Sequence, residues 1–271
     1  MGRVARLEGL VRLGAGREAE VFAWDERRVL RLARDASRSP RVEREARVLA
    51  AAQQAGAPVP SVYERLQLDG RAGAIVERLG NESLLDRLGR RPWSLPAVAR
   101  TLGEVHARVH QARAPAEVPA LRGELRARLE SPLVPGDVRR RALNLLDALP
   151  DGDRLCHGDF HPANLLPGRG GDYFVIDWTN GARGHPAADV ARTRLMLLGA
   201  EPPDDASPLL RRLHVVGRRP LLRGYLRAYR RTLPLAPELV ARWEPVCAAA
   251  RLAEDIATER ERLIALALGS R

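Results

Sequence analysis

The first third of the chain alternates apolar and polar residues in the way that is typical of β-strands. We predict strands within residues 7–34 and near 62–68 and 72–77, the last two joined by the turn Asp69-Gly70. Between them, the apolar spacing that begins at Ser39-Pro40 predicts a helix that ends at Gly56. This part of the sequence therefore predicts a small antiparallel sheet with one helix.

After Gly80 the apolar residues recur with the period of helices, and Ser94 is a suitable N-cap for the helix that follows it. Further helices are expected near 120–130, near 137–148 and from 186 to the end, with breaks at 199–207, 217–220 and 234–237. A mixed polar section at 155–178 interrupts the helices and contains a strand at 173–176. The predicted fold class is α+β and bilobal, with an N-terminal lobe over 1–79 and a larger, mainly helical C-terminal lobe over 80–271.

Positive charge dominates the composition, because 45 basic residues face 34 acidic ones and the net charge is +11. All the basic residues are arginines, and the sequence contains no lysine. Such an excess suits a nucleic acid, an anionic membrane or a single anionic ligand. The arginines are scattered, and aromatic residues make up only 4% of the chain, which leaves few platforms for stacking bases. We therefore expect no specific nucleic-acid partner.

Cysteine usage and hydropathy narrow the class of protein further. Cys156 and Cys247 are too few for a disulfide framework and lack the spacing of a metal site. No apolar run approaches the roughly 20 residues of a membrane-spanning helix, and residues 1–6 lack the apolar core of a signal peptide. The sequence predicts a cytoplasmic protein with reduced thiols and no membrane partner, and it favours no particular oligomeric state.

The densest group of polar residues lies in the mixed section, in the run His157-Gly158-Asp159-Phe160-His161-Pro162-Ala163-Asn164, and Asp177 follows at the end of an apolar strand. Phosphoryl transfer from a nucleotide needs this pattern. One carboxylate positions the acceptor hydroxyl and takes its proton, while an amide oxygen and a second carboxylate hold magnesium ions. Oxygen ligands suit Mg²⁺ better than zinc. The alternative is that the Gly-Asp turn and the strand-end Asp have structural roles only.

On these residues the sequence resembles the aminoglycoside phosphotransferase family, which consists of small-molecule kinases with a protein-kinase-like fold. The resemblance covers nearly the whole chain. It implies that Asp159 is the catalytic residue, that Asn164 and Asp177 are the metal ligands, and that His157 is the motif histidine. ATP (or another nucleoside triphosphate) and Mg²⁺ are the cofactors that the resemblance implies.

The segment from Gly14 to Val21 resembles the glycine-rich loop that covers ATP in these kinases. Glycines there let backbone N–H groups approach the phosphates, so the implied nucleotide contacts are Gly14, Gly16 and Val21. Ala19 stands where protein kinases have a third glycine. Taken alone, the segment reads as a hairpin turn.

The next strand normally carries a lysine that contacts the phosphates, and this sequence has Arg31 at that position. Arginine keeps the charge and can bind phosphate bidentately, but it is bulkier and its fork is rigid. Arg31 is alternatively a solvated strand residue. The ion-pair partner that the family places on the first helix corresponds best to Glu45, with Glu43 as the alternative.

Residues 74–80 resemble the hinge strand, in which the backbone of Glu77 and Leu79 meets the adenine edge; an edge strand leaving a sheet fits the same residues. Asp189, at a predicted helix start, is expected to brace the catalytic loop. His110 is expected to be packed and hydrogen-bonded, and His161 to shape the loop.

The acceptor is expected to be a small hydroxylated molecule, an aminoglycoside or another metabolite. Only the 11 residues 178–188 separate Asp177 from Asp189, too few for the activation segment with which protein kinases bind a peptide. A polycationic aminoglycoside needs an acidic pocket, and the late helices offer Glu254, Asp255, Glu259 and Glu261. These acids alternate with Arg251, Arg260 and Arg262, which favours a solvated helix face over such a pocket.

The leading prediction is thus an ATP-dependent phosphotransferase that moves the γ-phosphoryl group to a hydroxyl with Mg²⁺ and with Asp159 as the base. The alternatives are a kinase-like nucleotide-binding protein with little turnover, motivated by Arg31 and Ala19, and a basic nucleic-acid-binding protein, which is the less favoured of the two.

Overall fold

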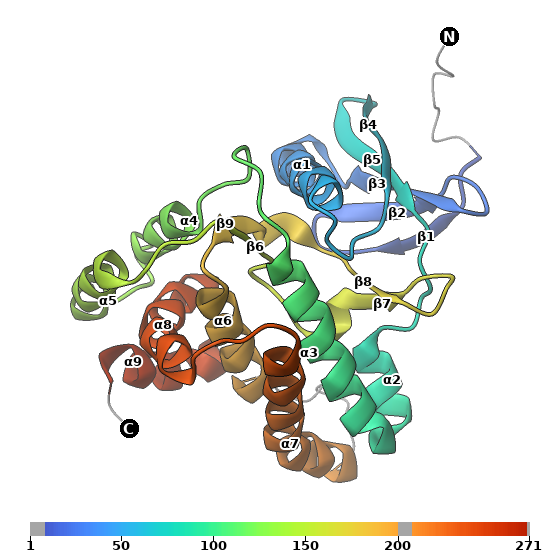
Figure 1. The fold of residues 1–271 in the computed structure, drawn as a ribbon. Coiled ribbons are helices and arrows are strands. Elements are labelled where there is room, and N and C mark those ends of the chain that lie inside the picture. Colours follow the sequence, from blue (N-terminus) through green and yellow to red (C-terminus); the bar gives the residue numbers. More distant parts are fainter. Residues whose placement is uncertain (1–8, 200–207, 270–271) are drawn as a thin grey trace.

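The computed structural model describes residues 9–199 and 208–269, and its N-terminal part is an antiparallel sheet of five strands (Figure 1). In chain order the strands are β1 (Arg12–Ala15), β2 (Ala19–Ala23), β3 (Arg28–Ala33), β4 (Val62–Leu68) and β5 (Arg71–Glu77). The order across the sheet is β1-β2-β3-β5-β4, and the single helix α1 (Ser39–Gln54) packs against β5. The predicted sheet with one helix is confirmed.

Local sequence signals explain most of this part. Asp69 and Gly70 both have positive φ, as a two-residue hairpin turn between β4 and β5 requires. Pro40 lies in the first turn of α1, where the missing N–H costs no hydrogen bond. The apolar face of α1, including Ala46 and Leu49, is buried against the sheet.

The C-terminal part is mainly helical (Figure 1). Its helices are α2 (Leu84–Arg90), α3 (Leu95–Gln111), α4 (Leu121–Leu129), α5 (Gly136–Ala148), α6 (Pro186–Gly199), α7 (Pro208–Thr232), α8 (Pro237–Arg251) and α9 (Arg260–Leu268). Two small two-stranded sheets lie among them, β6 (Arg154–Cys156) with β9 (Ala182–Gly184), and β7 (Leu165–Pro167) with β8 (Tyr173–Val175). The predicted α+β fold class is confirmed.

Two details of the helical prediction are wrong. α7 runs through Gly217 and Pro220 without a break, because the packing of α7 along α3 outweighs the one backbone hydrogen bond that a proline removes. Ser94 precedes α3 but its side chain makes no cap hydrogen bond, since a 3₁₀ turn over Pro92–Ser94 leads into the helix. The break at 234–237 is confirmed, whereas residues 200–207 of the first break lie outside the described residues.

Backbone and apolar contacts join the N-terminal part to the C-terminal part. The Gly80 N–H donates to the Pro167 carbonyl and the Val175 N–H to the Pro58 carbonyl, both at 2.8 Å. One buried apolar cluster extends from α1 and β5 through α3, α6 and α7 to α9. We propose that the boundary between the two lobes lies at residue 79, in the connection between the end of β5 and the start of α2.

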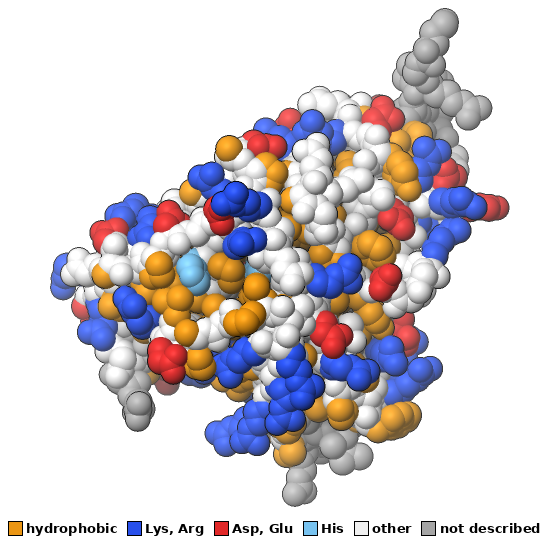
Figure 2. All heavy atoms as spheres, in the orientation of Figure 1, with side chains coloured by type: hydrophobic (Ala, Val, Ile, Leu, Met, Phe, Trp, Pro, Cys, Tyr) orange, Lys and Arg blue, Asp and Glu red, His pale blue; other side chains and the backbone are white. Residues whose placement is uncertain are grey.

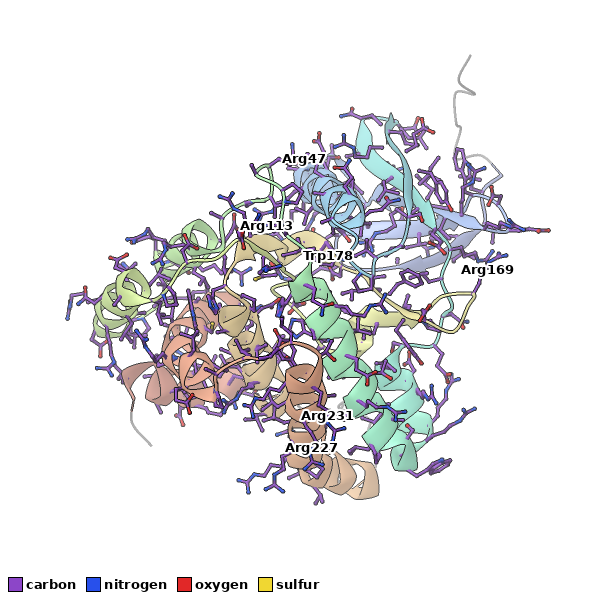
Figure 3. All side chains as sticks on the ribbon, viewed as in Figure 1. Arg47, Arg113, Arg169, Trp178, Arg227 and Arg231 are labelled. Atoms are coloured by element: carbon purple, nitrogen blue, oxygen red, sulfur yellow. The ribbon has the colours of Figure 1, made fainter. Side chains whose placement is uncertain are left out.

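Positive charge is spread over many elements. Figure 2 shows arginines scattered over the visible face, in places beside acidic groups. The arginines labelled in Figure 3 lie on α1 (Arg47), after α3 (Arg113), between β7 and β8 (Arg169) and on α7 (Arg227 and Arg231). Every helix within 9–199 and 208–269 is too short or too polar to cross a bilayer.

Candidate active site

The loop between β6 and β7 carries the predicted catalytic residue. Gly158 has a φ of +75°, and a Cβ there would lie 2.5 Å from the Asn180 carbonyl oxygen, so the tight path into the loop requires glycine. Asp159 follows, and its side chain is 27% exposed. The loop thus presents a carboxylate to solvent from a fixed backbone.

Asn164 joins the Asp159 loop to the segment that follows β8 and contains Asp177. Its Nδ2 donates to the Asp159 carbonyl at 2.9 Å, and its own carbonyl accepts the Ile176 N–H at 3.0 Å. His161 Nε2 also lies 3.2 Å from this Nδ2. Since the amide nitrogen of Asn164 is bound to the protein, its amide oxygen is the atom available to a cation.

Asp177 adopts the left-handed conformation, with φ 62° and ψ 67°, which Asp tolerates better than most residues. Its Oδ1 accepts a hydrogen bond from the Thr179 hydroxyl at 2.8 Å. The next residue, Trp178, is fully buried, its indole donates to the Val175 carbonyl, and it lies below α1 in the view of Figure 3. The structure therefore places Asp159, Asn164 and Asp177 on connected loops.

Two cationic or polar groups flank the Asp159 carboxylate. Arg192 Nη2 lies 3.6 Å from Oδ1, and His161 Nε2 lies 3.7 Å from Oδ2. Burial by itself raises the pKa of Asp159, but His161 and Arg192 outweigh it and lower the pKa to about 2. The carboxylate is therefore ionised at neutral pH.

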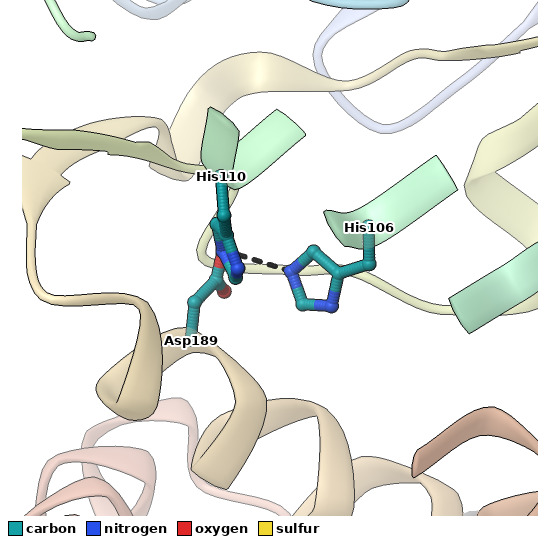
Figure 4. Close-up of side chains that lie close together, drawn as sticks. All are labelled: His106, His110 and Asp189. Carbon is teal, nitrogen blue, oxygen red and sulfur yellow. Dashed lines mark hydrogen bonds and ion pairs between the residues drawn. The ribbon is translucent and has the colours of Figure 1, made fainter. Parts of the chain in front are cut away.

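Asp189 holds this loop from below. Its Oδ2 accepts the N–H of His157 and its Oδ1 the N–H of Gly158, at 2.5 and 2.9 Å. The same Oδ2 lies 3.2 Å from His106 Nε2 and 3.1 Å from His110 Nε2 (Figure 4). The predicted bracing role of Asp189 agrees with these contacts, which fix the loop through its backbone.

The two histidines connect Asp189 to α7. The Tyr225 hydroxyl oxygen lies 2.7 Å from His106 Nδ1, and the Tyr229 hydroxyl oxygen lies 2.6 Å from His110 Nδ1. Burial lowers the pKa of His106 to about 3 and keeps that ring neutral. A neutral ring that donates a hydrogen bond from Nε2 to Asp189 accepts a hydrogen bond from the tyrosine hydroxyl at Nδ1. His110 is packed and hydrogen-bonded as predicted, and His106 was missed although it lies one helical turn before His110.

Hydrogen bonds also fix the motif histidine. His157 is buried; its Nε2 donates to the Ile176 carbonyl at 2.9 Å, and its Nδ1 accepts the Asp159 N–H at 3.2 Å. His157 therefore ties the residue before Asp177 to the backbone of Asp159.

The predicted glycine-rich loop is the β1–β2 hairpin. Gly14 pairs with Val21, and the Gly16 N–H donates to the Ala19 carbonyl at 2.8 Å. Glu18, at its tip, pairs with Arg41 Nη1 at 2.7 Å and with Arg38, which ties the loop to the start of α1. The segment is a hairpin, as its residues alone indicate, and it is anchored to the helix beside it.

Arg31 and Glu45 form the predicted ion pair, with Arg31 Nη2 2.8 Å from Glu45 Oε2. Glu43 is exposed. Burial raises the pKa of Glu45, while the Arg31 charge and a hydrogen bond from the Trp178 backbone oppose that rise. The side chain of Arg31 is only 25% exposed, so it is not a freely solvated strand residue.

The hinge segment is tied to its neighbours by the backbone. The Glu77 N–H donates to the Ser61 carbonyl at 2.8 Å, and the Glu77 carboxylate accepts from the Ser61 N–H and hydroxyl, both at 3.2 Å. Leu79 lies between two residues whose backbone N–H groups are hydrogen-bonded: that of Arg78 donates to the Arg27 carbonyl and that of Gly80 to the Pro167 carbonyl.

The expectation of a solvated face near the C-terminus is wrong for Arg251 and Glu259, whereas Glu254, Asp255 and Glu261 are exposed. Arg251 and Glu259 are only 7% and 5% exposed and form a two-pronged ion pair, at 2.6 and 3.0 Å. Glu254 accepts from Arg192 at 2.5 Å and from Arg251 at 2.8 Å. The chain is not one helix here, because Asp255 adopts the left-handed conformation between two 3₁₀ turns, and Glu259 at the end of the second turn is buried.

Comparison with known proteins bears on the chemistry of this cluster. The sequence profile described as "Phosphotransferase enzyme family" matches residues 9–235. The chain belongs to this phosphotransferase family. The search of curated proteins found no match. The resemblance drawn from the Asp159, Asn164 and Asp177 motifs is confirmed.

Solved structures with the same fold include aminoglycoside and choline kinases. A thermostable mutant of aminoglycoside phosphotransferase APH(4)-Ia, in ternary complex with AMP-PNP and hygromycin B, is 20% identical over 97% of this chain and 91% of its own, with a TM-score of 0.60. A choline/ethanolamine kinase family protein from Mesorhizobium loti is 18% identical over 96% and 87%, with a TM-score of 0.58. Choline kinase LicA from Streptococcus pneumoniae is 14% identical over 96% and 92%, with a TM-score of 0.60.

Proposed function

We propose that this phosphotransferase is an ATP-dependent kinase that moves the γ-phosphoryl group to a hydroxyl of a small molecule. The observation that carries the proposal is Asn164, which hydrogen-bonds to the backbone of Asp159 and to the residue before Asp177. This places a base and two oxygen ligands on connected loops. The structural neighbour that holds AMP-PNP and hygromycin B supports a nucleotide donor and a hydroxylated acceptor.

The nucleotide is assigned to the sheet side of the site. A Cβ on Gly14 would touch no described atom within 4 Å, so the fold itself does not require glycine there, whereas the close approach of a phosphate does. Arg31 is the cation for the phosphates, and Glu45 holds it. Since the Glu77 N–H is bound to Ser61, the Glu77 carbonyl and the backbone of Leu79 are the groups assigned to adenine.

The donor atoms at Asn164 and Asp177 fit a magnesium ion. An amide oxygen and a carboxylate are hard ligands, and the amide nitrogen of Asn164 already points to the Asp159 carbonyl. When bound there, Mg²⁺ neutralises the charge that develops on the phosphates.

Asp159 is assigned to the acceptor hydroxyl. The acceptor oxygen forms a bond to the γ-phosphorus, the bond from that phosphorus to the bridging oxygen breaks, and ADP leaves. The hydroxyl proton passes to Asp159. Asp159 orients the hydroxyl, and in a loose transition state it accepts the proton late.

A small acceptor fits the connection between Asp177 and Asp189. The residues between them form a 3₁₀ turn at 178–180 and then β9, which pairs with β6. Because this short segment is occupied by the 3₁₀ turn and by the pairing of β9 with β6, it provides no extended surface on which a peptide could bind.

Two measurements test the proposal. Mg²⁺ with millimolar ATP should raise the melting temperature of the wild type and of Asp159→Ala, and should raise that of Asp177→Ala less. Turnover on a panel of aminoglycosides, choline and other hydroxylated metabolites should be lost in Asp159→Ala and kept in Asp172→Ala, a matched change at an exposed Asp between β7 and β8. A wild-type protein with no thermal shift and no turnover contradicts the proposal.

A further inference from the structure

Arg192 is a buried arginine beside Asp159 that the sequence motifs do not include. It lies on α6, its side chain is only 7% exposed, and its Nε donates to the Gly158 carbonyl. Asp189, three residues earlier on the same helix, accepts the Gly158 N–H. α6 therefore holds both the N–H and the carbonyl of Gly158, immediately before the catalytic residue.

A row of alternating charges lies behind Arg192. Glu254 Oε1 accepts from Arg192 Nη2 at 2.5 Å, and Glu254 Oε2 accepts from Arg251 Nη1 at 2.8 Å. Arg251 in turn pairs with Glu259 through two hydrogen bonds. A buried guanidinium without a partner is strongly unfavourable, so Glu254 holds Arg192, while Arg251 and Glu259 in turn hold Glu254.

The distance from Arg192 to Asp159 matters for the chemistry. At 3.6 Å, Nη2 is beyond ordinary hydrogen-bond length from Oδ1. Arg192 thus acts on the carboxylate by its charge and leaves the oxygen lone pairs open to an acceptor hydroxyl. A positive charge at this distance favours the ionised form of the carboxylate.

We propose that Arg192 is a positioning residue for Asp159, and that Glu254 and Arg251 of the C-terminal segment fix its guanidinium. This inference rests on the proposed kinase function. The C-terminal segment 251–259 thereby contributes to phosphoryl transfer although it contains no part of the Asp159–Asn164–Asp177 motif.

Arg192→Gln tests the inference, with Arg194→Gln as the matched control on the same helix. Arg194 pairs at 3.8 Å with Glu244, away from the Gly158 carbonyl. With Mg-ATP and the best acceptor of the panel, or water as the acceptor, Arg192→Gln should lower kcat by up to about 100-fold, as misplacement of a reacting group does. The KM for ATP and the Mg-ATP thermal shift should stay at the wild-type values.

The Asp159→Asn background separates positioning from a general structural role. If Arg192 acts through the carboxylate, adding Arg192→Gln to Asp159→Asn lowers the single-turnover rate by less than about 3-fold, because coupled residues are not additive. A full additional loss in that background overturns the inference, as does a kcat equal to that of Arg194→Gln.

Glu254→Gln provides a second variant that keeps Arg192 itself. It should lower kcat in the same direction as Arg192→Gln and by a smaller factor, since Arg192 keeps its bond to the Gly158 carbonyl. If Arg192→Gln fails to fold, an unchanged kcat in Glu254→Gln overturns the inference. A wild type without turnover or a Mg-ATP thermal shift identifies failure of the kinase proposal instead.

Discussion

Arg31 of β3 and Glu45 of α1 lie 2.8 Å apart, and the backbone of Trp178 approaches the same glutamate and opposes the rise in its pKa that burial causes. The pair therefore connects the sheet, the helix and the residue that follows Asp177. Because the sequence contains no lysine, an arginine is the only basic side chain that can occupy this position at neutral pH. Arginine reaches farther than lysine and offers two prongs, and Glu45 uses one of them.

We predict that Arg31→Ala lowers kcat/KM for ATP by about 10- to 100-fold, because a hydrogen bond to a charged group contributes about 1.5–3 kcal/mol. Arg31→Lys should recover most of this loss, since it restores the charge but not the two-pronged geometry. Steady-state kinetics with varied ATP measure both changes.

Arg28→Ala is the control for Arg31, because Arg28 belongs to the same strand and pairs with Asp25 at the surface. Exposed pairs of this kind contribute little, so its kinetics should match the wild type. If Arg31→Ala and Arg31→Lys both leave ATP affinity and rate unchanged, the assignment of Arg31 to the phosphates is wrong.

We predict that the protein loses stability as the pH falls from about 6.5 toward 3. The pKa of His106 is lowered to about 3 by burial, so in this window the unfolded chain binds a proton that the folded chain does not. The loss from this ring is at most about 5 kcal/mol, at about 1.36 kcal/mol per pH unit. The lowered pKa of Asp189 adds a further loss below about pH 3.8. Urea unfolding at several pH values measures the trend.

His106→Gln removes this titration, so its free energy of unfolding should depend less steeply on pH between 6.5 and 4.5, whatever its stability at neutral pH. Glu104→Gln is the control for a substitution on the same helix, because its side chain is exposed. Equal slopes in wild type and His106→Gln would contradict the neutral, buried state of the ring.

The sequence predicted the parts of the fold and of the site whose signals are local. The Asp69-Gly70 turn, the Ser39-Pro40 helix start and the motif from Asp159 to Asn164 each lie within a few residues. Their chemistry is readable because neighbours along the chain determine it.

The parts that it missed depend on contacts between distant residues. His106 meets Tyr225 across 119 positions, and Arg192 meets Glu254 across 62. In sequence, Glu254 and its neighbours have the pattern of a solvated helix, and only the fold brings them to a buried arginine. The helix break predicted at Pro220 is wrong for the same reason. The local sequence does not show that α7 packs along α3 and continues through the proline.

We predict that Gly103→Ala lowers both stability and activity, while Gly89→Ala does not. A Cβ on Gly103 of α3 would lie 2.7 Å from the Tyr229 nitrogen and closer still to the Tyr225 carbonyl oxygen, so α3 and α7 must separate, at a cost of about 1–3 kcal/mol. These tyrosines contact the histidines that hold Asp189, so kcat should fall as well.

Gly89 of α2 has no described atom within 4 Å of a Cβ, and alanine there should stabilise the helix by about 0.5–1 kcal/mol. Urea unfolding and turnover assays of the two variants test this prediction. A Gly103→Ala protein as stable and active as Gly89→Ala would show that the close approach of α3 and α7 does not support the loop that carries Asp159.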